Sequence, residues 1–244
     1  MTQAKNNRPP PLALRARGPL ACFTRPELKT ERVSYPVMTP SAARGILEAV
    51  LWKPAIRWRV ERIKVLAPIA FTSFRRNEVS AVAPAPKSAT IERGGDYAPL
   101  LIEDRRQQRN TVALRDVDYV IEARIELTNR AGEGDNLAKF VDMFRRRVEK
   151  GQHFHQPYLG CREFAAEIEP VTDDTRGPID ETRDLGIMLW DIEFGEATRG
   201  KPQNRPVFFA ARLDAGVMEV PYDAAAAEAT LRAAHGLGGH GGRP

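Results

Sequence analysis

The sequence predicts an α+β fold: a ferredoxin-like βαββαβ domain with an inserted β-hairpin or loop and a small C-terminal β-hairpin region. Three observations support this class. Apolar and polar residues alternate from Val117 to Leu127, which is the period of a half-buried strand. Two segments, after Thr39 and after Asp135, space their apolar residues three and four apart, as one face of a helix requires. Strand patterns lie before, between and after these two helices, in the order that the class demands.

The first helix has a clear beginning. Alternation over residues 12–16 predicts a short first strand, and a loop should follow it. Thr39 then offers a side-chain oxygen as N-cap, and Pro40 suits the first helical position because no N–H is needed there. The apolar residues that follow share one helical face as far as Leu51, and Pro54 is expected to end the helix.

Two strands and a long insertion should come next. Residues 56–65 alternate and then change phase, which predicts one strand with a bulge or two strand segments. Residues 69–79 predict another strand, with Arg75 and Arg76 near its end. From Ser80 to Asn110 the composition turns to proline, alanine and charged residues without any period. We expect an insertion loop at about 80–110, because this stretch is too long for a simple connection.

The second helix follows the strand over residues 117–127. Asp135 or Asn136 can cap it, and its arginine-rich last turns suit the negative end of the helix dipole. Gly151 is expected to close it. Residues 185–194 predict the strand that completes the ferredoxin-like arrangement, which RNA-recognition domains also use.

The last part of the chain predicts a smaller unit. Residues 207–213 and 217–220, joined by Asp214, Ala215 and Gly216, should form a β-hairpin. A short helix is expected over residues 224–235, and disorder over 236–244. We therefore divide the chain into residues 1–194, the ferredoxin-like domain with its insertion, and residues 195–244, the C-terminal hairpin and flexible tail.

Basic residues outnumber acidic ones and gather in clusters. The formal net charge is +5 at pH 7, which favours a polyanionic partner. Arginines concentrate in residues 57–62, 75–76, 105–109 and 145–147. Their guanidinium groups can bind two phosphate oxygens at once. Any single cluster can be a solvated protein face, but several on one basic domain favour RNA or DNA.

The sequence gives little support to a metalloprotein, a disulfide-stabilised protein or a membrane protein. Cys22 and Cys161 lack the spacing of a zinc site or a disulfide framework. His153 and His155 make half a metal site at most, so we expect no metal and no cofactor. No apolar run reaches the roughly 18 residues that a bilayer span needs, and no signal-peptide core is present. We expect a soluble protein of the bacterial cytoplasm without membrane contact.

One stretch of the sequence is more informative about function than the overall composition is. A proline-fixed, arginine-bearing loop (24–38) runs into a capped helix (39–51) and directly on into residues 52–58. This stretch closely resembles the Cas5 family of CRISPR-associated proteins, in the form found in type I-C systems. Further motifs that resemble those members are residues 75–79, 107–109, 114–123, 144–147, 151–152, 156–164 and 183–186. The resemblance extends from about residue 21 to about residue 209.

The resemblance implies a fold, an activity and partners. Cas5 proteins belong to the RAMP superfamily and add a β-hairpin arm to a ferredoxin-like domain. They grip the 5′ repeat-derived handle of the CRISPR RNA in the Cascade surveillance complex, beside a large subunit and a backbone subunit, and the assembled complex engages target DNA. In type I-C systems they also cleave the precursor RNA without metal, by attack of a ribose 2′-OH on the adjacent phosphate.

The resemblance also locates the catalytic positions of that cleavage. The family has a Tyr or His just before a Trp-Lys-Pro motif, and a Lys-His pair in the first turn of the second helix. In this sequence the first position is Leu51, and the pair is Lys139 and Phe140. Leu51 and Phe140 have no transferable proton, and packing in the core explains both. We therefore expect a degenerate nuclease site in which Lys139 alone remains.

The RNA-binding residues are also assigned by resemblance. Basic side chains would contact phosphates and aromatic ones would stack on unpaired bases, although each aromatic could instead pack beneath the loop. The predicted set is Arg25, Lys29, Arg32, Tyr35, Arg44, Trp52, Lys53, Arg75, Arg76, Arg145 and Arg146.

Three functions stay open at this point. The first is a CRISPR RNA-binding subunit with little or no nuclease activity. The second is a metal-independent endoribonuclease that cuts at the base of the repeat stem-loop, with Lys139 and a substitute group at His153, His155 or Tyr158. The third is contact with target DNA near the protospacer-adjacent motif, through the arginine-rich insert or Arg145 to Arg147.

Overall fold

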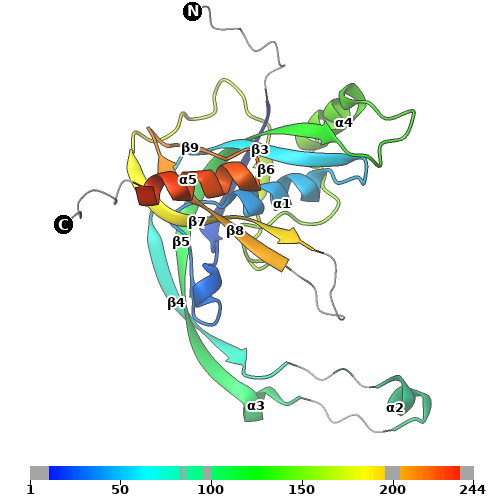
Figure 1. Cartoon of the computed structure of the whole chain (residues 1–244). Helices are drawn as coiled ribbons and strands as arrows, with labels where there is room; N and C mark the ends of the chain where they lie inside the picture. Colours follow the sequence, from blue (N-terminus) through cyan, green and yellow to red (C-terminus); the bar gives the residue numbers. More distant parts are fainter. Residues whose placement is uncertain (1–10, 83–84, 86, 96–99, 196–203, 237–244) are drawn as a thin grey trace, which may run out of the picture.

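A computed structural model describes residues 11–82, 85, 87–95, 100–195 and 204–236 of the chain (Figure 1). Its elements in chain order are β1 (Leu12–Ala21), η1 (Pro26–Leu28), β2 (Arg32–Val33), α1 (Pro40–Val50), β3 (Ile56–Val65), β4 (Phe71–Val79), α2 (Ser88–Glu92), α3 (Ile102–Arg105), β5 (Arg106–Leu127), α4 (Leu137–Glu149), β6 (Glu167–Glu169), β7 (Arg183–Phe194), β8 (Asn204–Leu213), β9 (Val217–Glu219) and α5 (Ala224–Gly236).

The main sheet confirms the ferredoxin-like class. Its strands run in the order β6-β1-β5-β3-β9, and neighbours in this order are antiparallel, whereas the short β2 pairs with β5 in parallel. Helix α1 connects β1 to β3 and α4 connects β5 to β6, so the chain order is βαββαβ. The bulge predicted in β3 is present as a register shift between Val60 and Arg62.

The prediction for the last strand of this motif was wrong. Residues 185–194 lie in β7, which pairs with β8 in a separate two-stranded sheet. The fourth strand is instead β6, which pairs with the Arg15–Arg17 part of β1. With only three residues and two glutamates, β6 is too short and too polar to produce an alternating pattern.

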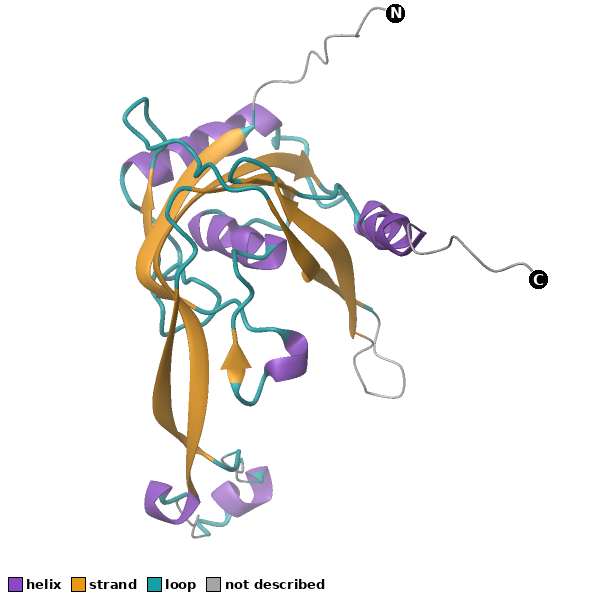
Figure 2. Cartoon of the chain, turned by 90° about the vertical axis from the view of Figure 1, so that its left-hand side faces the viewer, coloured by secondary structure: helices purple, strands orange, loops and turns teal. Residues whose placement is uncertain are grey.

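A hairpin arm projects from the body of the molecule (Figure 2). Strand β5 is 22 residues long: residues 114–123 pair with β1 and residues 119–127 with β3, whereas residues 106–114 pair with β4. The inserted hairpin is therefore confirmed, but residues 106–110, expected in the loop, are strand. None of residues 71–79 and 106–110 is buried, so no buried apolar face is required there and the sequence shows no period over residues 106–110.

Both helices begin as their caps predict. Thr39 Oγ1 accepts a hydrogen bond from the Ala42 amide at 3.3 Å, and the Asn136 side chain accepts one from the Lys139 amide at 2.9 Å. Gly151, at φ +61°, closes α4 as expected. Helix α1, however, ends before Pro54, because Leu51 is already extended and its carbonyl accepts the Trp58 indole N–H at 2.8 Å.

The C-terminal region keeps the predicted turn but not the predicted hairpin. Ala215 and Gly216 both have positive φ and make a tight turn between Asp214 and Val217. Beyond the turn the strands separate: β8 pairs with β7, and β9 joins the main sheet beside β3. Helix α5 packs against β8 as a terminal helix. The proposed boundary at 194/195 falls between the paired strands β7 and β8, and the two-domain division stays a prediction, as does disorder beyond the described residues.

Candidate RNA interface

At the end of α1, a buried apolar side chain is followed by an exposed aromatic residue and an exposed basic residue. Leu51 is 0% exposed, whereas the next residue, Trp52, is 58% exposed and Lys53 is also exposed. The loop is held in place from below, because Thr128 donates from its amide and its hydroxyl to the carbonyls of Ala55 and Pro54. A base can therefore reach the Trp52 ring without any change in the backbone.

The first turn of α4 lies beside this loop. Phe140 is 2% exposed, and its neighbour Lys139 points outward, with Nζ 2.9 Å from Asp135 Oδ1. The hydrogen bond from Lys139 lowers the pKa of Asp135, with a smaller contribution from the charge of Lys53. Both lysines therefore act on one carboxylate, and a phosphate could exchange with Asp135 as their partner.

The core beneath explains why two family positions are apolar. The Phe144 and Trp58 rings lie 4.7 Å apart between the helices and the sheet, and Leu51 and Phe140 belong to the same buried cluster. A hydroxyl or imidazole at these positions would have to turn out of this cluster, toward the exposed surface beside it, because the apolar side chains provide no hydrogen-bond partner. Neither residue present can take or give a proton.

Two of the three substitute groups lie near this site. The Phe154 amide donates to the Ala49 carbonyl at 2.8 Å, which brings His153 and His155 to the last turn of α1. Both histidines are exposed, and the Phe154 ring between them is 86% exposed. Tyr158 lies elsewhere, because it borders a 280 Å³ hollow formed with the first half of α1.

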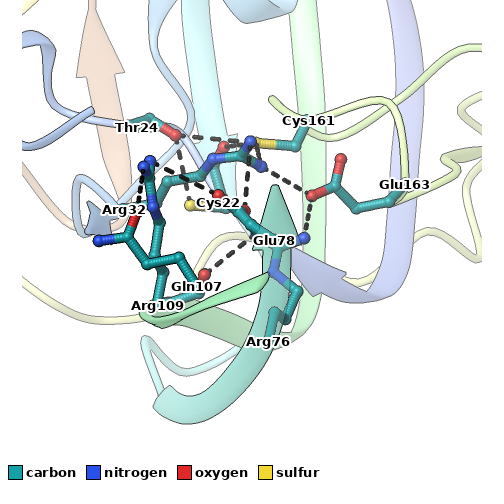
Figure 3. A network of polar contacts seen from close by, with 10 residues as sticks. Cys22, Thr24, Arg32, Arg76, Glu78, Gln107, Arg109, Cys161 and Glu163 are labelled. Atoms are coloured by element: carbon teal, nitrogen blue, oxygen red, sulfur yellow. Dashed lines mark hydrogen bonds and ion pairs between the residues drawn. The ribbon is translucent and has the colours of Figure 1, made fainter. Parts of the chain in front are cut away.

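A second basic group surrounds the base of the arm (Figure 3). Arg32 and Arg76 both bind the carboxylate of Glu163, the former at 2.9 Å, and Glu78 accepts weaker ion pairs from both. Partial burial alone would raise the pKa of Glu163, but the hydrogen bond from Arg76 and the charge of Arg32 hold it below its ordinary value. These two arginines are thus already paired with carboxylates.

The remaining residues predicted to bind RNA also divide into those with internal partners and those that are exposed. The Arg25 guanidinium lies 4.8 Å from the centre of the Tyr35 ring, and Tyr35 is 1% exposed, so this ring offers no free face to a base. Arg44 forms a two-pronged ion pair with Asp191 and a second one with Glu48. The exposed members of the predicted set are Lys29, Trp52, Lys53, Arg75, Arg145 and Arg146.

Three residues that belong to these sites, Asp135, Phe154 and Glu163, are missing from the set predicted above. Asp135 stands four residues before Lys139, a spacing that favours an ion pair on a helix and could have revealed it. Phe154 is an aromatic residue between two histidines, in a segment without period. Glu163 is paired with residues some 90 to 130 positions away, so only the folded chain reveals its role.

Two observations limit other classes of function. In the described part of the chain, no three histidine, cysteine or acidic side chains come together as a metal site requires, and freedom from metal stays an expectation. None of the helices described here has the length and apolar character needed to cross a bilayer.

A ferredoxin-like sheet with a projecting hairpin arm is the architecture that the sequence resemblance implies, and it is consistent with the RAMP class of proteins. The chain belongs to the Cas5 family, in its Cas5d form: the family model described as "CRISPR-associated protein (Cas_Cas5)" matches residues 11–221. The sequence resemblance to this family is thereby confirmed.

Two relatives are similar over most of their length. A protein of Mannheimia succiniciproducens, named as the CRISPR pre-crRNA endoribonuclease Cas5d, is 48% identical over 212 residues, which cover 84% of this chain and 92% of the relative. A protein of Thermus thermophilus with the same name is 42% identical over 224 residues, covering 86% and 91%.

Solved structures support the fold. A crystal structure of a CRISPR-associated protein superposes with a TM-score of 0.60 at 22% identity, covering 85% of this chain and 90% of the other. A functionally uncharacterized protein from Streptococcus mutans gives a TM-score of 0.59 at 19% identity, with the same coverage.

Proposed function

We propose that this protein is a CRISPR RNA-binding subunit of a type I-C-like Cascade complex in the bacterial cytoplasm, and that its nuclease site is degenerate. It would hold the 5′ repeat handle of the guide RNA in antiviral defence, beside a large subunit and a backbone subunit, and act on target DNA within the assembled complex. Family membership and the exposed Trp52–Lys53 surface support RNA binding.

The burial of Leu51 and Phe140 carries the second half of the proposal. RNA cleavage without metal needs a base for the 2′-OH and an acid for the leaving 5′-oxygen. At the family's positions stand two apolar side chains that belong to the core. Lys139 remains beside them and can still neutralise a phosphate, so binding does not depend on the lost groups.

Binding can be tested with fluorescently labelled RNA that carries the repeat handle of the accompanying CRISPR array. We expect tight binding that weakens steeply with salt, and weaker binding of a scrambled RNA and of single-stranded DNA with the handle sequence. Equal affinity for all three probes would contradict handle recognition.

A second candidate function is the metal-independent endoribonuclease. Both relatives carry that name, and the bond from Phe154 to Ala49 supports it by bringing His153 and His155 to the end of α1. This function requires cleavage of precursor RNA in EDTA that is lost in Lys139→Ala and reduced in His153→Ala or His155→Ala. A purified protein that binds the precursor and leaves it intact would exclude it.

A further inference from the structure

The two cysteines of the chain meet at the base of the arm (Figure 3). Cys22 follows β1, and Cys161 lies in the loop between α4 and β6. The Cys22 amide donates to the Leu159 carbonyl at 3.0 Å, and Cys161 Sγ lies 3.4 Å from the Cys22 carbonyl oxygen. Gly160 packs closely against the same carbonyl, because a Cβ at this position would lie 2.2 Å from the oxygen. The loop and the end of β1 are therefore held in direct contact.

The two thiols are not equivalent. Cys161 is partly exposed, and its sulfur receives contacts from Arg32 Nη1 at 3.8 Å and Thr24 Oγ1 at 3.7 Å. Cys22 is fully buried and lies 3.5 Å from the same threonine hydroxyl. Interaction with the Cys22 thiol lowers the pKa of Cys161 to about 6, and interaction with Cys161 raises the pKa of Cys22. Arg32 also lowers the pKa of Cys161, whereas Glu163 opposes it.

This arrangement has the parts of a reactive thiol pair. A partly exposed cysteine that faces an arginine is suited to be the attacking thiolate, and a buried thiol beside the same threonine hydroxyl is placed to resolve the product. Neither RNA binding nor RNA cleavage, as proposed above, uses either sulfur.

We propose that Cys161 and Cys22 form a peroxide-reactive pair that closes to an intramolecular disulfide. The Cys161 thiolate attacks one oxygen of hydrogen peroxide; the O–O bond breaks, the sulfur becomes a sulfenic acid, and hydroxide leaves and takes up a proton as water. The Cys22 sulfur then attacks Cys161 Sγ, forming the S–S bond and releasing a second water. In sum two thiols are oxidised and one peroxide is reduced to two waters.

The bond would act at the base of the arm. It would join β1 to the loop that carries Glu163, the carboxylate shared by Arg32 and by Arg76 of β4. It would also remove the thiolate that faces Arg32. Oxidation is thereby linked to the contacts between the arm and the body, independently of whether the protein cuts RNA.

The wild-type protein gives a direct test, because it has two cysteines and no others. After treatment with hydrogen peroxide, unfolding and alkylation without reductant, the intact monomer should carry no alkyl group and should have lost two hydrogen atoms. Reduction should restore both alkylation sites. Two alkylated thiols after oxidation, or a product that consists of disulfide-linked dimers, would overturn the proposal.

The order of the steps has its own test. In Cys22→Ser the Cys161 sulfenic acid should persist and react with dimedone, whereas the matched Cys161→Ser variant should not be labelled. In the folded wild type, the rate of Cys161 alkylation should show a pH midpoint near 6, and Arg32→Gln should move the midpoint upward. A wild-type midpoint near that of a free cysteine, about 8.5, would refute the activated thiolate without relying on any variant.

Discussion

The two basic regions of this protein differ in what their charges already bind. At the end of α1 and the start of α4, Trp52 and Lys53 are exposed above an apolar interior, and Lys139 forms an ion pair with Asp135. At the base of the arm, Arg32 and Arg76 share Glu163 and Glu78. In the first region Trp52 and Lys53 are open to a new partner, whereas Arg32 and Arg76 in the second are already paired with internal carboxylates.

This difference shows that the number of arginines in a region does not indicate how well the region can bind RNA. An arginine paired with a carboxylate must lose that partner before it can bind a phosphate, and the carboxylate left behind repels the phosphate as well. We therefore expect the first region to determine RNA affinity, and the second to determine how the arm is held.

The largest effect should come from restoring proton-transfer groups in the first region. The double variant Leu51→Tyr/Phe140→His should cut precursor RNA in EDTA, at a rate about 10²–10⁴-fold above that of the wild type, because general acid–base groups contribute about that much. Single-turnover gel assays measure it. Adding Lys139→Ala to this variant should abolish the gain, and circular dichroism should confirm that the double variant is folded. A folded double variant that leaves RNA intact would show that these two positions do not account for the loss.

Removing the exposed aromatic should weaken binding. Trp52→Ala should lower affinity for handle RNA by about 1–3 kcal/mol, the usual contribution of one stacked base. Trp52→Phe is the matched control, because it keeps a ring and should retain most of the affinity. Equal binding by all three proteins, measured by fluorescence anisotropy, would remove Trp52 from the interface.

An arginine with internal partners should behave in the opposite way. Asp191→Asn removes one carboxylate from the half-buried Arg44 and should reduce the free energy of unfolding by about 1–3 kcal/mol. Affinity for handle RNA should stay within about twofold of wild type, because a fold-stabilising pair does not contact the ligand. Urea unfolding and anisotropy on the same sample separate the two effects. A rise in affinity well beyond twofold would place Arg44 in the interface instead, because the substitution frees its guanidinium for a phosphate.

The smallest effect concerns pH and the base of the arm. Because the pKa of Glu163 is lower in the folded protein, its ion pairs stabilise the fold above the unfolded pKa and are lost as pH falls through the folded value. Glu163 is partly exposed, so the contribution should be about 1 kcal/mol or less. Glu163→Gln should therefore be less stable than wild type at pH 7, and the difference should shrink towards pH 3. A difference that does not vary with pH would mean that charge at Glu163 is not involved.

Local patterns predicted the elements that form around the core. Thr39 and Asn136 cap the helices because their side chains act on the next turn, a short-range effect that a sequence displays. Strand β6 and residues 106–110 of β5 were missed, since neither is held by an apolar face. The burial of Phe140 followed from helical spacing. Leu51 is buried as predicted, but it lies extended just past the end of α1. The pairing of Arg32, Arg44 and Arg76 depends on contacts between distant segments.

The most direct test follows binding and cleavage in a single reaction. Purified wild-type protein is incubated in EDTA with end-labelled precursor RNA, and the same sample is analysed on native and denaturing gels. The account predicts a shifted band on the native gel and full-length RNA on the denaturing gel. A specific cut at the base of the repeat stem-loop, lost in Lys139→Ala, would contradict it and would mean that other groups have replaced those missing at Leu51 and Phe140.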